Sequence, residues 1–363
     1  MKIKSIVLVL LISILTSCYS NRVSQRPKQM QNTSMNTVVN PAASTLDLYL
    51  EKQHFEGSIL VASKNKILLK KGYGFADKIK SVPNEPDTVF RIASLSKAFT
   101  AMAIMQLQEQ GKLKVSDPIS SYLPEIKHGD RITIHHLLAH LSGLPREFES
   151  EKWDDPAKRL KEKLATDFQL QHEPGTAFFY SNVGYVILGH LIEKLSGKTY
   201  AEYMNEHIFE PLQMKNSYVE AITPSEREGK AIGYENNLFG QSRQVTFFQS
   251  DPGPGGISST VEDLYLWDQA LYSEKLVNEN SMREIFKDHA PSNGKYGYGW
   301  SIEDVNLNIY SHLGYIPGFF SFIKRDVQNH RTVILLSNKG EDSYNLQQES
   351  KLTQLIAELI KDT

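Results

Sequence analysis

Ser94 and Lys97 are three positions apart at the start of a long apolar segment of the chain. In a helix, this spacing places both side chains on one face, one turn apart. A lysine amine that burial keeps uncharged could then take the serine proton and make the hydroxyl a nucleophile. Backbone N–H groups at the start of that helix could stabilise an oxyanion. The same S-x-x-K pattern begins at three other serines, none of which starts an apolar helix: Ser63, Ser292 and Ser321.

Two shorter motifs supply further groups suited to acyl transfer. In Tyr180-Ser181-Asn182, the tyrosine could pass a proton to a leaving group and the asparagine could hold a substrate amide. His312 begins the single H-x-G of the chain, which ends at Gly314. Each motif alone also fits a structural role, such as a capping asparagine or a buried histidine. Y-x-N begins at three other tyrosines: Tyr19, Tyr203 and Tyr234.

Other kinds of reactive site are not supported by the sequence. It contains no G-x-S-x-G and no H-E-x-x-H, so an α/β-hydrolase elbow and a zincin site are unsupported. His136 and His140 are four positions apart, but no acidic residue accompanies them, which favours core or turn packing over a metal site. The one cysteine excludes a CxxC zinc site. We therefore expect neither a metal nor a cofactor.

Composition narrows the class of protein. The 363 residues include 40 Lys+Arg and 42 Asp+Glu, a formal net charge of -2. This balance argues against nucleic-acid binding, which usually needs a basic face. Charged residues at 23% and aromatic residues at 10% are typical of a globular protein. At about 150 residues per domain, the length suits two domains or one domain with an insertion.

The N-terminal residues predict export and a lipid anchor. Residues 1–17 join a short basic start to an apolar run that is too short to span a bilayer but suits a signal peptide. The run ends at Cys18 and resembles the bacterial lipobox, in which cleavage precedes a lipidated cysteine. The alternative is an ordinary secretory signal with an incidental cysteine. Residues 18–44 are polar and predict a flexible tether, so we expect a lipid-anchored protein in the bacterial cell envelope, outside the cytoplasm.

Both ends of the folded part predict strands next to a helix. A first helix is expected from about Thr45, where apolar residues recur at helical spacing, followed by a β-hairpin at 58–62 and 67–69. Strands return near the C-terminus, around 299–302, 319–324 and 332–337. A final amphipathic helix carries its apolar residues on one face: Leu352, Leu355, Ile356, Leu359 and Ile360.

The segment between these ends is mainly helical in pattern. Residues 95–110 are periodic up to Gly111, and residues 183–196 are periodic up to Gly197, each glycine suiting the position after a helix. The sequence therefore predicts an α+β domain over 45–363. Segments 45–93 and 291–363 would form one antiparallel sheet flanked by the terminal helices, and 94–290 an inserted, mainly helical subdomain.

In this order, S-x-x-K, Y-x-N and [KH]-x-G resemble the serine β-lactamase and penicillin-binding-protein superfamily. The similarity is strongest to its class C β-lactamase-like branch, which includes D,D-peptidases and family VIII-type esterases. The resemblance extends over about residues 45–361. Among the segments that carry it are FRIASLSKAFTAMAIMQLQEQGKL at 90–113, LLAHLSGLP at 137–145, YGYGW at 296–300 and HLGYIPGFFS at 312–321.

The resemblance implies a five-stranded sheet and a role for each motif residue. Ser94 would be the acylated nucleophile, Lys97 its general base and Tyr180 the second acid/base residue. Asn182 would also orient Lys97, and backbone N–H groups of Ser94 and Tyr315 would form the oxyanion hole. The substrate-binding positions would be Asn182, His312, Gly314 and Tyr315.

One position departs from the class C pattern and bears on the substrate. Class C β-lactamases have a lysine where this chain has His312, and a histidine is mostly neutral at pH 7. Recognition of a β-lactam carboxylate should therefore be weaker, so we expect a carboxypeptidase or esterase rather than an efficient β-lactamase. The partner would be a small-molecule or peptide substrate. The alternatives are a non-catalytic peptidoglycan- or peptide-binding lipoprotein of the same fold, and a purely structural envelope lipoprotein.

Overall fold

The computed structural model describes most of the chain after its N-terminal segment. The described residues are 41–148, 169–220, 229–236, 241–245, 253, 255–290, 295–348 and 350–361. The expected signal peptide, Cys18, most of the expected tether and the S-x-x-K at Ser292 lie outside them. Within this part of the chain, we find no helix of sufficient length and apolar character to cross a membrane.

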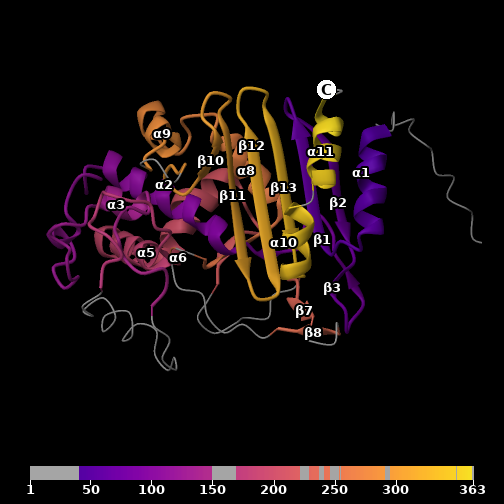
Figure 1. Cartoon of the computed structure of the whole chain (residues 1–363), viewed down its shortest axis with the longest axis horizontal. Coiled ribbons are helices and arrows are strands. Elements are labelled where there is room, and N and C mark those ends of the chain that lie inside the picture. Colours follow the sequence, from indigo (N-terminus) through magenta and orange to yellow (C-terminus); the bar gives the residue numbers. More distant parts are fainter. Residues whose placement is uncertain are drawn as a thin grey trace, which may run out of the picture. The chain divides into compact units, whose positions relative to one another are not determined.

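The main sheet has six strands, each antiparallel to its neighbours, in the order β10-β11-β12-β13-β1-β2 (Figure 1). The strands are β10 (Ser301–Asp304), β11 (Ile309–Ile316), β12 (Phe319–Asp326), β13 (Arg331–Ser337), β1 (Gly57–Ser63) and β2 (Lys66–Tyr73). The two ends of the chain meet where β1 pairs with β13, from Gly57 opposite Ser337 to Ser63 opposite Arg331. The α+β class and the antiparallel sheet are thus confirmed.

The expected number of five strands in this sheet is wrong, because β11 is a full strand of its own. Its burial alternates only in part, and its centre is Ser311-His312-Leu313-Gly314, which is neither an apolar run nor rich in β-branched residues. Pairing with β12 along its whole length, from Ile309 opposite Asp326 to Ile316 opposite Phe319, holds it in the sheet. Tertiary pairing thus overrides a weak local preference for strand.

Apolar residues bury the sheet on both faces, which accounts for the continuous apolar runs of β1 and β13. On the outer face, Ile59, Val61, Val333 and Leu335 join one cluster with the helices α1 (Pro41–Lys52) and α11 (Ser350–Lys361). These helices lie together at the same side of the sheet (Figure 1). The first helix begins at Pro41 rather than near Thr45, and Leu46 and Leu50 are the core residues it contributes.

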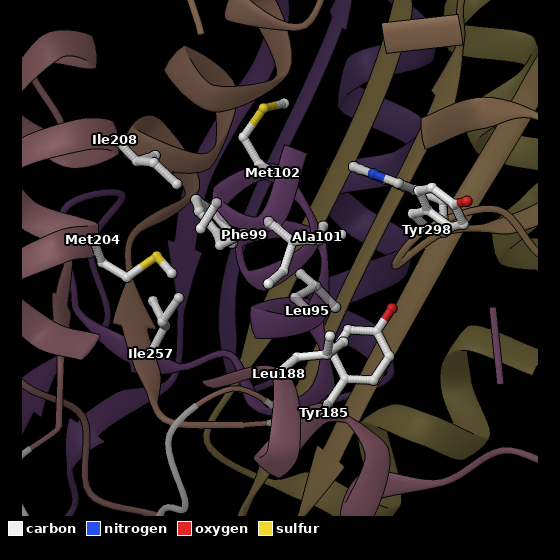
Figure 2. Packing of buried hydrophobic residues seen from close by; sticks show 14 of the residues in the cluster. Leu95, Phe99, Ala101, Met102, Tyr185, Leu188, Met204, Ile208, Ile257 and Tyr298 are labelled. Atoms are coloured by element: carbon white, nitrogen blue, oxygen red, sulfur yellow. The ribbon is translucent and has the colours of Figure 1, made fainter. Parts of the chain in front are cut away.

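The alternate residues of the same strands face the inserted region. Leu60, Ile334 and Leu336 belong to the second cluster, with helices α2 (Ser96–Glu109), α5 (Asn182–Ser196) and α8 (Val261–Ala270). Phe99 of α2 stacks on Trp267 of α8 with ring centroids 4.1 Å apart. Figure 2 shows how the side chains of α2 and α5 interlock in this core. The helix that carries Lys97 is therefore packed on several sides and has a fixed position.

Both predicted helix ends are confirmed. Gly111 follows the C-cap of α2 with φ of +71°, and Gly197 is the C-cap of α5 with φ of +72°. At the other end of α5, the Ser181 hydroxyl caps the helix by accepting the N–H of Gly184. Because Ser181 lies inside Tyr180-Ser181-Asn182, this cap fixes the motif at the first turn of the helix.

The inserted region also contains short strands and turns among its helices. One three-stranded sheet, β5-β9-β6, holds the strand that precedes Ser94. The remaining elements are β3 (Phe75–Asp77), β4 (Val82–Pro83), β5 (Phe90–Arg91), η1 (Ala93–Leu95), η2 (Ile119–Ser121), α3 (Ile134–Leu138), α6 (Tyr200–Met204), η3 (Asn205–Phe209), α7 (Glu210–Leu212), β6 (Tyr218–Val219), β7 (Tyr234–Asn236), β8 (Ser242–Gln244), β9 (Ile257–Ser259), α9 (Glu279–Phe286) and α10 (Gly340–Gln348).

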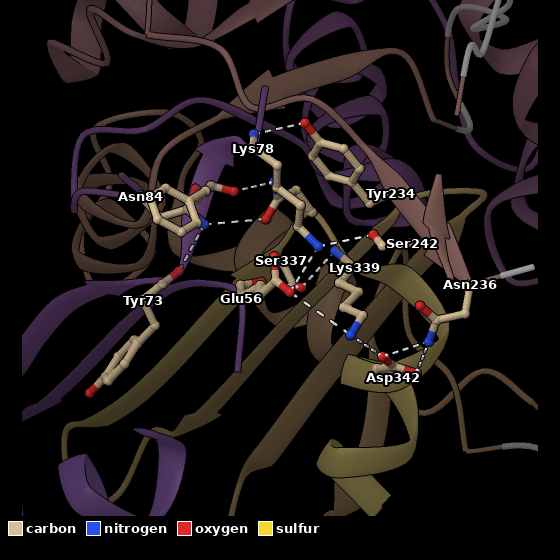
Figure 3. Close-up of polar contacts among 12 residues, drawn as sticks. Glu56, Tyr73, Lys78, Asn84, Tyr234, Asn236, Ser242, Ser337, Lys339 and Asp342 are labelled. Atoms are coloured by element: carbon tan, nitrogen blue, oxygen red, sulfur yellow. Dashed lines mark hydrogen bonds and ion pairs between the residues drawn. The ribbon is translucent and has the colours of Figure 1, made fainter. Parts of the chain in front are cut away.

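Two buried asparagines, of which Figure 3 labels Asn84, tie this region to the end of the main sheet. Asn338, directly after β13, donates to the carbonyls of Ile232 at 2.8 Å and Phe75 at 2.9 Å. Asn84 donates to the Asn338 side chain at 3.2 Å. The Glu56 carboxylate lies nearby, 3.0 Å from the Lys78 amine. Segments far apart in sequence are thus joined by polar contacts as well as by the two apolar clusters.

Candidate active site

Ser94 lies in the turn η1, between strand β5 and helix α2. Ala93 has a φ of +47°, an uncommon value for a residue other than glycine, and such strain is often found at functional sites. The turn is held by the Ile92 N–H, which donates to the Ile257 carbonyl at 3.0 Å, and by the Leu95 N–H, which donates to the Ile92 carbonyl. Ser94 is half-buried, whereas its neighbours Ala93 and Leu95 are buried.

Lys97 is fully buried, and its amine lies 3.1 Å from the Ser94 hydroxyl oxygen. The amine also lies over two rings, 4.9 Å from the centroid of Tyr180 and 5.5 Å from that of Tyr185. Burial holds the pKa of Lys97 well below its usual value; the negative charge of Glu147 opposes this shift, and the positive charge of Arg146 adds to it. An uncharged amine at neutral pH is the form that can accept the serine proton.

Tyr180 is the third group at this point. The desolvation of its phenol raises the pKa of Tyr180 above the ordinary value, and the neighbouring Ser94 side chain lowers it. The charge of Arg146 also opposes the increase. At neutral pH, Tyr180 is therefore protonated and can donate its proton. The two motifs predicted to cooperate, S-x-x-K and Y-x-N, meet at the Ser94 hydroxyl.

Asn182 is the first residue of α5, directly after the capping Ser181. Its side-chain N–H donates to the Glu147 carboxylate, and its backbone N–H donates to the Arg146 carbonyl at 2.8 Å. Its side-chain oxygen is buried and has no hydrogen-bond partner among the described residues. Glu147 thus sets the orientation of the amide, and the amide oxygen is the group that a donor on a substrate could use.

His312 lies in β11 and is buried, with 4% of its surface exposed. Its Nδ1 is 2.7 Å from the Leu313 carbonyl, which can only accept, so we assign the ring proton to Nδ1. Its Nε2 then accepts from the Tyr296 hydroxyl at 2.9 Å. Burial lowers the pKa of His312 to about 3, with the charge of Lys97 contributing. The side chain is therefore neutral and directed at Tyr296.

Gly314 is the point at which β11 lies against the turn that holds Ser94. A β-carbon at this position would lie 2.4 Å from the Ile92 carbonyl oxygen and 2.8 Å from the Ser94 backbone nitrogen. Only glycine allows so close an approach. Tyr315 is the next residue of β11. Among the described residues, the pairing of β11 with β10 reaches only to Ser311, so Tyr315 lies beyond it, and Tyr315 is 43% exposed. The strand thus brings the Tyr315 backbone to the turn that holds Ser94.

Several residues next to these groups were not predicted. Arg146 lies over the Tyr180 ring, with its guanidinium carbon 5.4 Å from the ring centroid, and Glu147 binds Asn182. Tyr296 binds His312. Arg146 and Glu147 directly follow the segment LLAHLSGLP, and Tyr296 begins YGYGW. Both segments were part of the family resemblance, but the resemblance assigned no role to these three residues.

The two histidines of HHLLAH that are four positions apart have separate structural roles. His136 Nδ1 accepts the Thr133 N–H and completes the capping box of α3. His140 is buried against the Tyr180 ring, with centroids 4.1 Å apart. Packing, the interpretation favoured from the sequence, is confirmed for both. Among the residues with described positions, no group of three His, Cys, Asp or Glu side chains could hold a metal ion.

Comparison with known proteins gives one consistent family. The model of the Beta-lactamase family matches residues 42–357. Penicillin-binding protein 4* of Bacillus subtilis (strain 168) is 31% identical over 317 residues, which is 81% of this chain and 70% of that protein.

Solved structures agree with that match. The penicillin-binding protein from Bacillus halodurans superposes with a TM-score of 0.75 at 28% identity, covering 83% of this chain and 98% of the other. D-amino acid amidase from Ochrobactrum anthropi SV3 superposes with a TM-score of 0.76 at 25% identity, covering 89% of this chain and 99% of the other.

Proposed function

Because the chain belongs to the beta-lactamase family, we propose that it is a serine hydrolase that works through an acyl-enzyme on Ser94. The observation that carries the proposal is the meeting of three groups at one hydroxyl. The Lys97 amine lies 3.1 Å from the Ser94 oxygen and 4.9 Å from the centroid of the Tyr180 ring, and the Ser94 side chain is close enough to Tyr180 to lower the pKa of its phenol. A buried amine of lowered pKa beside a half-exposed serine is the arrangement that nucleophilic catalysis requires.

In the first half-reaction, Lys97 takes the proton from the Ser94 hydroxyl while the oxygen forms a bond to the substrate carbonyl carbon. The negative charge that develops on the carbonyl oxygen is stabilised by backbone N–H groups of Ser94 and Tyr315. When the bond to the leaving group breaks, the Tyr180 phenol donates a proton to that group. The proton held by Lys97 can then return to Tyr180. Attack of water on the ester releases the acid and restores Ser94.

For the substrate, we propose a D-amino-acid peptide, amide or ester in preference to a β-lactam. The neutral, buried His312 offers no cation to a substrate carboxylate. The Asn182 amide, oriented by Glu147, suits a substrate that carries an amide near the bond that is broken. Relatives named as penicillin-binding proteins and a D-amino acid amidase fit this class of substrate.

For the location, we propose a lipid anchor at Cys18 in the bacterial cell envelope, with the catalytic domain from residue 45 onward outside the cytoplasm. The support is the lipobox-like segment that ends at the single cysteine of the chain. Mass spectrometry of the membrane fraction would find acyl chains on Cys18. The Cys18→Ala variant should be a soluble protein or an uncleaved precursor. An unmodified Cys18 in a mature, membrane-bound protein would refute the anchor and leave the enzymatic proposal intact.

The test of the enzymatic proposal is a substrate panel of nitrophenyl esters, D-Ala-D-Ala peptides and a chromogenic cephalosporin. We expect ester or D-peptide hydrolysis and little cephalosporin hydrolysis. Ser94→Ala should abolish turnover and labelling by a fluorophosphonate without changing the melting curve. The matched control is Ser121→Ala, at an exposed serine of η2. A folded wild-type protein that is neither labelled nor active would instead indicate the non-catalytic, ligand-binding alternative.

A further inference from the structure

His140 is a buried histidine for which the mechanism above has no use. It follows α3, has a φ of +58° and exposes none of its surface. A histidine with positive φ is uncommon and is often held in place by its surroundings. Its contacts point to the segment that carries Tyr180.

Two hydrogen bonds from that segment end on His140. The Phe179 N–H donates to the His140 carbonyl at 2.9 Å, and the Ser181 N–H donates to the His140 Nδ1 at 3.0 Å. These donors are the residues directly before and after Tyr180. Because Nδ1 accepts a hydrogen bond, the proton of the neutral ring lies on Nε2.

The imidazole ring also contacts the Tyr180 side chain itself. The two centroids are 4.1 Å apart, with an angle of 32° between the planes. The rings of Tyr185 and Tyr296 lie 5.1 Å and 4.8 Å from His140. Burial holds the pKa of His140 well below its usual value, and the charges of neighbouring groups, Lys97 first among them, act in the same direction. The ring therefore stays neutral and keeps Nδ1 as an acceptor.

We propose that His140 is the positioning residue that sets the catalytic conformation of Tyr180. It holds the backbone on both sides of the tyrosine and one face of its ring, so the phenol oxygen is directed at Ser94. The inference rests on the proposed function, since it assigns a role within that active site. His140 touches no reacting atom and acts only through Tyr180.

A general structural role is a weaker explanation, because the start of α5 has other supports. The Ser181 hydroxyl donates to the Pro145 carbonyl at 2.7 Å and accepts the Gly184 N–H at 3.1 Å. The Asn182 N–H donates to the Arg146 carbonyl. These contacts hold the helix start without His140. The contacts that His140 adds are with Tyr180 and with the backbone on either side of it.

Two variants separate the acceptor from the ring. In His140→Asn, the side-chain oxygen can occupy the place of Nδ1, and asparagine tolerates positive φ. In His140→Phe, the ring remains, but the Ser181 N–H loses its acceptor in a buried site. The matched controls are His54→Asn and His54→Phe, because His54 is exposed and has a similar φ of +51°.

The experiment measures kcat/KM for an alkyl ester, whose leaving group needs a proton, per fluorophosphonate-labelled site. It also measures the pH profile of kcat/KM and hydrogen exchange of the Ser181 amide. We expect His140→Phe to lose about tenfold to a hundredfold in kcat/KM through kcat, with a displaced pH profile and Ser181 exchange at least about tenfold faster. His140→Asn should recover the protection of the Ser181 amide and part of the activity, because it restores the acceptor but not the ring contact. The His54 variants should match the wild type.

Three results would overturn the inference. They are unchanged kcat/KM per labelled site in His140→Phe, unchanged Ser181 protection in that variant, or equal losses in His140→Asn and His140→Phe. An inactive wild type would count against the proposed function instead. The exchange measurement needs no turnover, so in that case it would still decide whether His140 holds the Tyr180 segment.

Discussion

Lys97 is fully buried, yet its amine lies 3.1 Å from the hydroxyl oxygen of Ser94, a half-buried residue. Desolvation disfavours the ammonium form; the Glu147 carboxylate favours it, and the Arg146 guanidinium disfavours it. The faces of two tyrosine rings also favour the ammonium form, because an aromatic ring attracts a cation. The balance lowers the pKa of Lys97, as the role of general base that we propose for it requires.

The variant Lys97→Arg tests this role. A guanidinium cannot lose its proton in the physiological range, so it retains the charge but cannot act as a base. We expect ester hydrolysis to fall by about 10²-fold or more. The wild-type acylation rate should reach its plateau at a pH well below 10.4, the ordinary value for lysine. Pre-steady-state release of nitrophenol across a pH series measures both quantities.

The control for that substitution is Lys112→Arg, at an exposed lysine just after α2. It makes the same chemical change on the surface, so its activity should equal that of the wild type. If Lys97→Arg kept its activity while the control also did, another group would have to take the Ser94 proton.

At the scale of elements, the site depends on the contact between β11 and the turn η1. Ser321 of the neighbouring strand donates to the Ile92 carbonyl at 2.6 Å, and Gly314 lies against both Ile92 and Ser94. Strand β11, strand β12 and the turn η1 are therefore in contact at this one point. The turn that holds Ser94 and strand β11, to which we assign the second oxyanion donor, cannot move apart without losing this contact.

Gly314→Ala should separate these segments. The new methyl group would overlap the Ile92 carbonyl oxygen, so the strand or the turn must shift. Overpacking of this kind costs about 1–3 kcal/mol of stability, and a displacement of about 1 Å at a catalytic site can reduce the rate about 10²-fold. Measurement of the free energy of unfolding together with kcat/KM would show both effects.

Gly184→Ala is the matched control, because its β-carbon would meet Leu137 at 3.5 Å, an ordinary contact, within helix α5. This variant should leave the activity unchanged, since Gly184 lies two residues beyond Asn182 and an α-helix favours alanine over glycine. Full activity in Gly314→Ala would mean that the spacing of β11 and η1 does not matter for catalysis.

Prediction from the sequence succeeded where local patterns and tertiary packing agree. The ends of α2 and α5 follow from glycines at 111 and 197, whose positive φ favours glycine. The pairing of β1 with β13 could be predicted because both strands are continuous apolar runs, which indicates burial on both faces of the sheet. β11 was missed as a strand because His312 and Gly314 serve the site and weaken its apolar pattern.

The candidate site likewise contains residues that the sequence predicts and residues that it does not. Ser94, Lys97 and Tyr180 belong to motifs of fixed spacing and order, and the structure brings them together. Arg146 and His140 contact Tyr180 from segments distant in sequence from those motifs, and such contacts cannot be read from motif spacing. The sequence also could not predict that the His312 side chain is directed toward Tyr296.

For the whole molecule, buried histidines make stability depend on pH. Burial lowers the pKa of His312 to about 3 and that of His135 to about 4, and the pKa of His140 is lowered as well. In the unfolded chain, each would titrate near 6.5. Between these values, the unfolded state binds more protons than the native state. Their contribution to stability is therefore full above pH 6.5 and is lost as the pH falls toward the native pKa values.

We accordingly expect the free energy of unfolding, measured by urea titration, to fall as the pH is lowered from 6.5 to 4.5. One such histidine contributes at most about 1.4 kcal/mol per pH unit. His312→Gln removes one titrating group, so the slope of stability against pH should decrease by up to that amount, whatever the change in stability at pH 7. Carboxylates act equally in both proteins and cancel in the difference. Equal slopes in the variant and the wild type would show that His312 takes up its proton equally in the native and unfolded states.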